Sequence, residues 1–128
     1  MADANRALPL IRRIVEDIVS EYARWREMVH EYELASALST ADAPNPEAEH
    51  FQRAAQASAE EIEQFVAELE ALGVHFKGFD LGLVDFPTER DGREVFLCWK
   101  LGEPNVAFWH DVDDGYSGRQ PLRPAAAG

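Results

Sequence analysis

The stretch DLGLVDFPTERDGREVFLCWKLGEPNVAFWHD (80–111) decides the fold of the second half of this chain. Its apolar and β-branched residues form short runs separated by turn residues, which is typical of antiparallel strands. The pair Asp91-Gly92 is a strong signal for a two-residue hairpin turn. GEPN (102–105) provides a second turn into residues 106–111. We therefore predict a three-stranded antiparallel β-meander over residues 79–111.

The two turns predict a strand register. A turn at Asp91-Gly92 places Asp85 opposite Cys98, and a turn at Glu103-Pro104 places Leu97 opposite His110. Because side chains alternate across a strand, this register sorts them into two faces. The predicted inner face is almost wholly apolar and comprises Val84, Phe86, Val95, Leu97, Trp99, Leu101, Val106, Phe108 and His110. The predicted outer face is mixed and comprises Leu83, Asp85, Phe96, Cys98, Lys100, Ala107, Trp109 and Asp111.

The first half of the chain predicts two long helices. Apolar residues recur at alternating spacings of four and three, which is coiled-coil spacing. The loop STADAPNP (39–46) separates the two series, so we expect an antiparallel helical hairpin over residues 3–72. Asn45 and Pro46 suit the start of the second helix and Gly73 suits its end. The two series are Ile11, Val15, Ile18, Tyr22, Trp25, Val29, Tyr32 and Phe51, Ala55, Ser58, Ile62, Phe65, Leu69, Leu72.

Together these elements predict an α+β domain over residues 1–122, with the meander packed on the hairpin and residues 123–128 as a flexible tail. The chain has 128 residues and a net charge of −12. Half of this negative charge lies in residues 46–72, which contain seven glutamates and one arginine. Such acidity disfavours nucleic acid and anionic membranes as partners. A single cysteine, no apolar run of about 18 residues and no secretory signal favour a cytoplasmic location.

Several short motifs of the sequence resemble those of a known family. GLVDFP (82–87), DGREVFLCWKLGE (91–103), FWHD (108–111) and GRQPL (118–122) occur in order, after an opening DANRALPL (3–10). In these words the chain resembles the prokaryotic family named domain of unknown function 2203. That family has no established activity, so the resemblance implies an architecture and a small prokaryotic protein but no reaction.

The outer face is the first candidate site. Asp85 lies diagonal to Lys100 in the predicted register, and a charge pair among aromatic residues can orient a polar ligand. The alternative is that Asp85 and Lys100 form a purely structural cross-strand pair beside a buried, unreactive cysteine. Arg119 follows a glycine-rich turn and is expected to reach back to Asp111 or Asp113. The candidate ligand or interface residues are Asp85, Phe96, Cys98, Lys100, Trp109 and Arg119.

A metal site is the second candidate. His110, Asp111 and Asp113, with Asp85 nearby, provide donors that suit a divalent cation such as manganese, iron or zinc. The predicted register places His110 and Asp111 on opposite faces, which weakens this hypothesis. The alternative is a histidine bonded to a backbone carbonyl, followed by an ordinary Asp-Gly turn.

These features predict a homodimeric interaction or regulatory module without catalysis. Two long helices and both faces of the meander carry more apolar surface than one small domain would bury by itself. No catalytic residue and no cofactor are assigned. The alternative is a small metal-binding protein or metal-dependent enzyme centred on His110, Asp111, Asp113 and Asp85.

Overall fold

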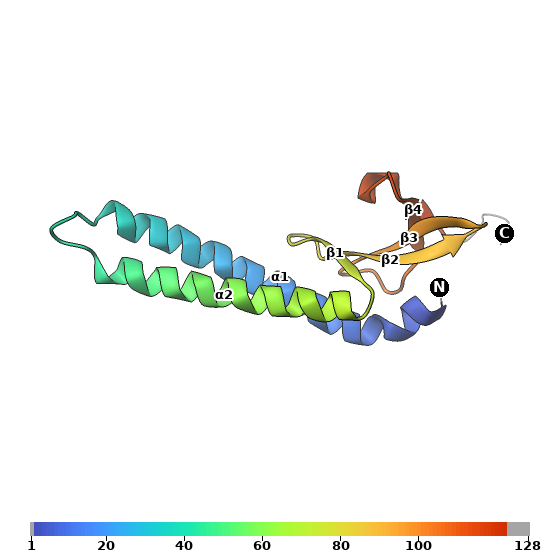
Figure 1. Cartoon of the computed structure of the whole chain (residues 1–128), viewed down its shortest axis with the longest axis horizontal. Coiled ribbons are helices and arrows are strands. Elements are labelled where there is room, and N and C mark those ends of the chain that lie inside the picture. The colour runs from blue at the N-terminus through green and yellow to red at the C-terminus, as the bar shows by residue number, and fades with distance from the viewer. Residues whose placement is uncertain (1, 123–128) are drawn as a thin grey trace.

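The computed structural model describes residues 2–122, which form two long helices followed by an antiparallel sheet (Figure 1). The predicted α+β class is confirmed. The predicted number of strands is wrong, because the described residues form a five-stranded sheet in the order β1-β2-β3-β4-β5. The predicted tail, residues 123–128, lies outside the described residues. The elements are α1 (Ala2–Ala37), α2 (Pro46–Ala71), β1 (His75–Gly78), β2 (Leu83–Arg90), β3 (Arg93–Lys100), β4 (Phe108–Asp111), a 3-10 turn (Tyr116–Gly118) and β5 (Gln120–Pro121).

The predicted ends of α2 are confirmed. At the start, the side chain of Asn45 accepts a hydrogen bond from the Glu47 N–H at 3.0 Å, and Pro46 occupies the first helical position. At the end, Gly73 has φ +80°, and the N–H of Val74 donates to the carbonyl of Leu69 at 3.0 Å. Leu69 and Val74 are both buried, which completes the apolar contact of a Schellman motif.

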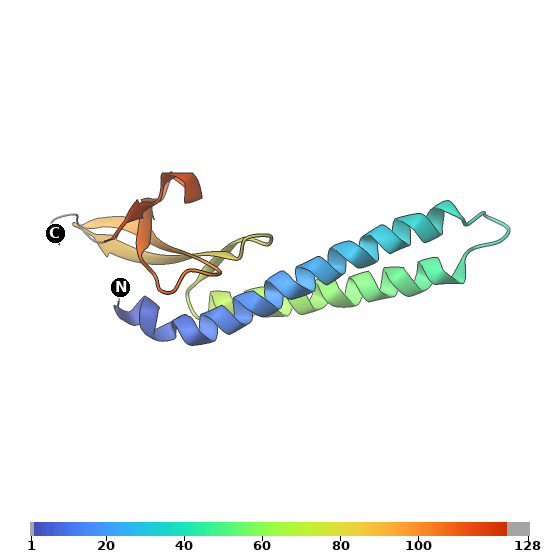
Figure 2. The same cartoon turned by 180° about the vertical axis from the view of Figure 1, so that it is seen from behind.

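The two helices run antiparallel, side by side, and the sheet covers only one end of the pair (Figures 1 and 2). On the covered end Ile11, Val15 and Ile18 are fully buried. Gly82, with φ +68°, shows how closely the chain leading into β2 approaches α1. A Cβ at that glycine would lie 2.9 Å from Val15 Cγ1. The sheet therefore packs on the first half of α1 and leaves the hairpin tip projecting away from it.

The β2–β3 hairpin has the predicted register. Asp91 and Gly92 have φ values of 54° and 76°, so both central residues take the left-handed conformation that a two-residue type I′ turn requires. Arg90 pairs with Arg93, and Asp85 pairs with Cys98. This register was readable because backbone sterics at two adjacent residues decide it.

The predicted β3–β4 register is wrong by one residue. His110 pairs with Phe96, and Trp109 pairs with Leu97. The chain turns earlier than predicted, since Gly102 takes φ +106° and the Glu103 N–H donates to the Lys100 carbonyl at 3.0 Å.

The rest of the β3–β4 connection is held by α1. Asn5 Oδ1 accepts from the Val106 N–H at 2.7 Å, and Asn5 Nδ2 donates to the Val106 carbonyl at 3.4 Å. The register shift exchanges the faces of β4. Phe108 and His110, predicted to lie inside, are on the outer face, and Trp109, predicted to lie outside, is in the core.

Two short strands escaped prediction. β1 has four residues and an irregular register against β2, and β5 has two residues, one of them Pro121. Such segments carry too few residues for an alternating pattern to stand out. They matter for the site, because β1 borders the outer face beside β2 and β5 ties the end of the chain to β4.

Candidate binding site on the outer face of the sheet

Asp85, Cys98 and His110 meet on the outer face of the sheet, one from each of three adjacent strands. Asp85 and Cys98 are direct cross-strand partners, and β4 brings His110 alongside them. One donor atom from each residue lies within 4.8 Å of the other two. All three residues are buried, at 5%, 1% and 4% exposure. A buried polar cluster facing away from the hydrophobic core is the most distinctive feature of this sheet.

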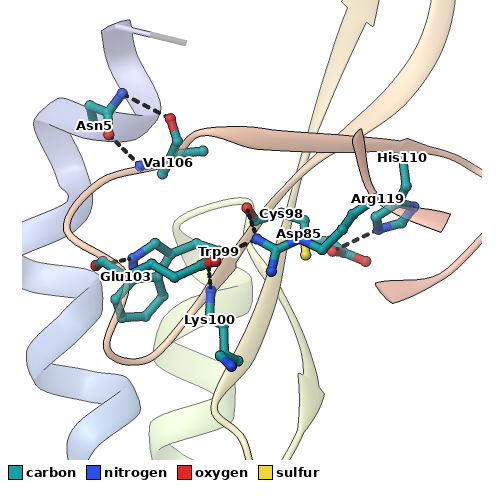
Figure 3. A network of polar contacts seen from close by, with 9 residues as sticks. All are labelled: Asn5, Asp85, Cys98, Trp99, Lys100, Glu103, Val106, His110 and Arg119. Atoms are coloured by element: carbon teal, nitrogen blue, oxygen red, sulfur yellow. Dashed lines mark hydrogen bonds and ion pairs between the residues drawn. The ribbon is translucent and has the colours of Figure 1, made fainter. Parts of the chain in front are cut away.

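Both ring nitrogens of His110 are engaged. Nδ1 lies 2.8 Å from the backbone oxygen of Asp111. Nε2 lies 3.0 Å from Asp85 Oδ1 (Figure 3). Because a carbonyl oxygen only accepts, Nδ1 carries a proton and donates it. The other ring nitrogen, Nε2, faces the Asp85 carboxyl. The arrangement fixes the orientation of the imidazole ring within the sheet.

Cys98 is a buried thiol that is not activated as a nucleophile. Burial raises its pKa from 9.0 to about 11, and this effect outweighs the opposing effect of the Arg119 guanidinium. The carboxylates of Asp85 and Glu103 raise the pKa further. A reactive cysteine needs a lowered pKa or a free base beside it. Here the neighbouring imidazole already has both nitrogens occupied.

The cluster forms the base of a pocket of about 250 Å³. Phe96 and Leu83 line it from the sheet, and Lys77 lines it from β1. The chain after β4 supplies the remaining wall through Val112, Asp114, Gly115 and Tyr116. The pocket thus combines apolar walls with a small group of converging polar atoms, as small-ligand sites usually do.

Comparison with known proteins identifies a family. A family model described as "Uncharacterized conserved protein (DUF2203)" matches residues 1–122. The chain belongs to the DUF2203 family. No curated protein and no solved structure matches this chain. The DUF2203 match spans both helices and the whole sheet, so it covers the elements that build the pocket.

In this DUF2203 chain Arg119 fastens the segment after β4, but to a different carboxylate from the predicted ones. Its guanidinium donates to Glu103 Oε1 at 2.8 Å and to the Cys98 carbonyl at 3.4 Å (Figure 3). The same guanidinium lies 3.9 Å from the Phe108 ring centroid and 4.8 Å from that of Tyr116. Glu103 also accepts from the Lys100 N–H at 2.8 Å. The sequence predicted Glu103 as a turn residue but did not predict that it pairs with Arg119.

The other predicted site residues are dispersed. Asp111 pairs with Arg93 at 2.9 Å, and Asp113 is exposed, so neither joins His110. Trp109 is in the core, with Arg90 4.7 Å from its ring centroid. Lys100 makes no ion pair with Asp85 among the residues described. Of the predicted outer-face set, Asp85, Phe96 and Cys98 line the pocket of this DUF2203 protein, and His110 takes the place expected for Trp109.

Proposed function

We propose that this chain is a homodimeric binding module without catalysis of its own. The occupied ring nitrogens of His110 and the raised pKa of Cys98 support a binding role for the outer-face pocket over nucleophilic chemistry. The hairpin provides the dimer contact in this proposal. The observation that carries it is the uncovered apolar surface of the distal hairpin, which we define as residues 27–62.

The distal hairpin leaves several of its large apolar side chains exposed or only half-buried. Leu34 in α1 and Leu38, the residue that directly follows α1, are 53% and 78% exposed. Tyr32 and Phe51 are only half-buried, although both belong to the predicted helical seams. The sheet lies at the other end of the hairpin, so no described part of the same chain covers this surface (Figure 2). A two-helix hairpin commonly completes its core by packing against two further helices.

A second copy of the chain is the partner that fits this surface. The α2 part of the distal hairpin, residues 46–62, is roughly 25 Å long at about 1.5 Å per residue. Two helices side by side, each about 10 Å wide, then offer a face of roughly 500 Å². Two such faces would bury about 1,000 Å² in total, the lower bound for a specific interface. The excess glutamates on α2 oppose close approach, so salt should strengthen the dimer.

Light scattering after size-exclusion chromatography tests the proposal. We expect a dimer for the wild-type chain and a shift towards monomer for the double variant Leu34→Gln, Leu38→Gln. The matched control replaces Leu10 and Leu81 by glutamine. Both are 52% exposed but lie outside the distal hairpin, so their loss should leave the mass unchanged. A monomeric wild-type chain, or a control that dissociates as readily as the test variant, would refute the proposal.

A further inference from the structure

We propose that Asp85, Cys98 and His110 bind one divalent transition-metal ion of the zinc class, and that this ion is the ligand of the outer-face pocket. The inference deepens the proposed function, since it names what the binding module holds. It also revises the ligand set expected from sequence, because Cys98 replaces Asp111 and Asp113. The juxtaposition that carries it is a carboxylate, a thiol and an imidazole nitrogen within 4.8 Å of one another.

The orientation of His110 is the first step. A metal-binding histidine usually donates one ring N–H to a carbonyl or carboxylate, which leaves the other nitrogen to bind the metal. His110 has this arrangement, with Nδ1 2.8 Å from the Asp111 carbonyl and Nε2 directed at the cluster. The donor to the metal is therefore Nε2, and the backbone of β4 holds the ring in place.

The spacing of the donors is the second step. Metal–nitrogen and metal–oxygen bonds of about 2.0–2.2 Å in a tetrahedral site place the two donor atoms roughly 3.3 Å apart. His110 Nε2 and Asp85 Oδ1 are 3.0 Å apart, so a metal ion needs a separation only slightly larger than the present one. The sulfur of Cys98 lies within 4.8 Å of a donor atom of each of the other two residues, so it is placed to become the third ligand.

The donor types decide the class of ion. Calcium and magnesium take oxygen ligands throughout, whereas thiolate and imidazole donors favour zinc, cobalt and iron. Carboxylate and thiolate together neutralise the two positive charges of the ion, which lowers the cost of holding it in a buried site. Because cysteine binds a metal as the thiolate, binding releases the Cys98 thiol proton to solvent.

The pocket supplies the fourth coordination position. The protein cluster offers three ligands, and the remaining side opens into the space lined by Asp114 and Tyr116. A water molecule or a small exogenous ligand can reach the ion from there. Three protein ligands with one exchangeable position is the arrangement of zinc sites that bind a further molecule.

Titration of the full-length, untagged, chelator-treated chain with Co²⁺ tests the inference. Tetrahedral Co²⁺ gives intense visible d–d bands, and a Co²⁺–thiolate bond adds an ultraviolet charge-transfer band. The chain has one cysteine, so a charge-transfer band shows that Cys98 itself binds the metal. We expect one equivalent of Co²⁺ to produce both bands and Zn²⁺ to abolish them by displacement.

Matched variants separate this site from the one expected from sequence. Cys98→Ser should remove the charge-transfer band, and His110→Asn and Asp85→Asn should weaken Co²⁺ binding more than about 10-fold. Asp111→Asn and Asp113→Asn should bind as the wild type does. Absence of the charge-transfer band with Co²⁺ in excess, or equal weakening in the Asp111 and Asp113 variants, would overturn the inference. The mass by light scattering in the same samples reports the dimer separately, so the two proposals can fail independently.

Discussion

Replacement of Trp109 by alanine tests the strand register on which the candidate site depends. In the register predicted from sequence this side chain lies on the outer face, where its loss would cost little. In the structure it is 8% exposed and belongs to the hydrophobic core. The two registers therefore predict different stabilities for one variant.

The expected cost follows from burial. A tryptophan side chain buries about 150–250 Å², so at roughly 25 cal/mol per Å² its transfer contributes about 4–6 kcal/mol. Large-to-small substitutions of buried aromatic residues typically cost about 3–5 kcal/mol, and we expect Trp109→Ala to fall in that range. The Arg90 guanidinium 4.7 Å from the ring centroid adds a smaller loss.

Urea denaturation followed by far-ultraviolet circular dichroism measures the cost. With a slope of about 1–3 kcal/mol per M, a loss of about 4 kcal/mol moves the midpoint by more than about 1 M. Phe108→Ala serves as the comparison, because Phe108 packs under Arg119 on the outer face, and we expect a smaller cost there. A cost below about 1 kcal/mol for Trp109→Ala, or a larger cost for Phe108→Ala, would refute the observed register.

Three further outcomes are expected. Gly82→Ala should lower the free energy of unfolding by about 2 kcal/mol or more, because a Cβ at that position would clash with α1. Gly92→Ala should cost only the strain of its positive φ, because nothing lies near its Cβ position, and thermal melts of the two variants test the difference. Glu103→Gln should cost about 2 kcal/mol because the largely buried Arg119 loses its negatively charged partner, and a double-mutant cycle with Arg119→Met measures the coupling. Cys98 should react slowly with iodoacetamide at neutral pH. The pKa of Cys98 in the folded chain, about 11, exceeds the ordinary value of 9.0. The neutral thiol should therefore stabilise the fold below pH 9, and this contribution should be lost as the pH rises to about 11. The stability of Cys98→Ala should not show this loss.

The features that sequence predicted correctly are decided within a few adjacent residues. Asp91-Gly92 sets the first hairpin, because both residues must take positive φ. Asn45 with Pro46 begins α2, and Gly73 ends it, because capping chemistry is local. The α+β class followed from the change of apolar period along the chain. Each of these signals could be read without knowing what lies elsewhere in the fold.

The features that sequence missed depend on contacts between distant parts of the chain. The β3–β4 connection is held by Asn5, which clasps Val106 across 101 positions of sequence. Glu103 holds the same connection by accepting from Lys100 and from Arg119, which follows β4. No pattern within residues 101–107 reveals either partner. The GEPN stretch by itself therefore predicts a turn, but a β3–β4 register that differs by one residue from the observed one.

The one-residue difference in the β3–β4 register determines whether the chain has a candidate site. In the predicted register His110 faces the core and Asp85 faces outward, so they could not meet. In the observed register the side chain of His110 reaches Asp85 at 3.0 Å. The register is held by α1 through Asn5 and by the Arg119–Glu103 pair, so the geometry of the site depends on contacts with α1 and with the segment after β4. Asn5→Ala, which touches none of the three cluster residues, should therefore weaken Co²⁺ binding along with stability, while Asp3→Asn, at an exposed position in the same turn of α1, should change neither.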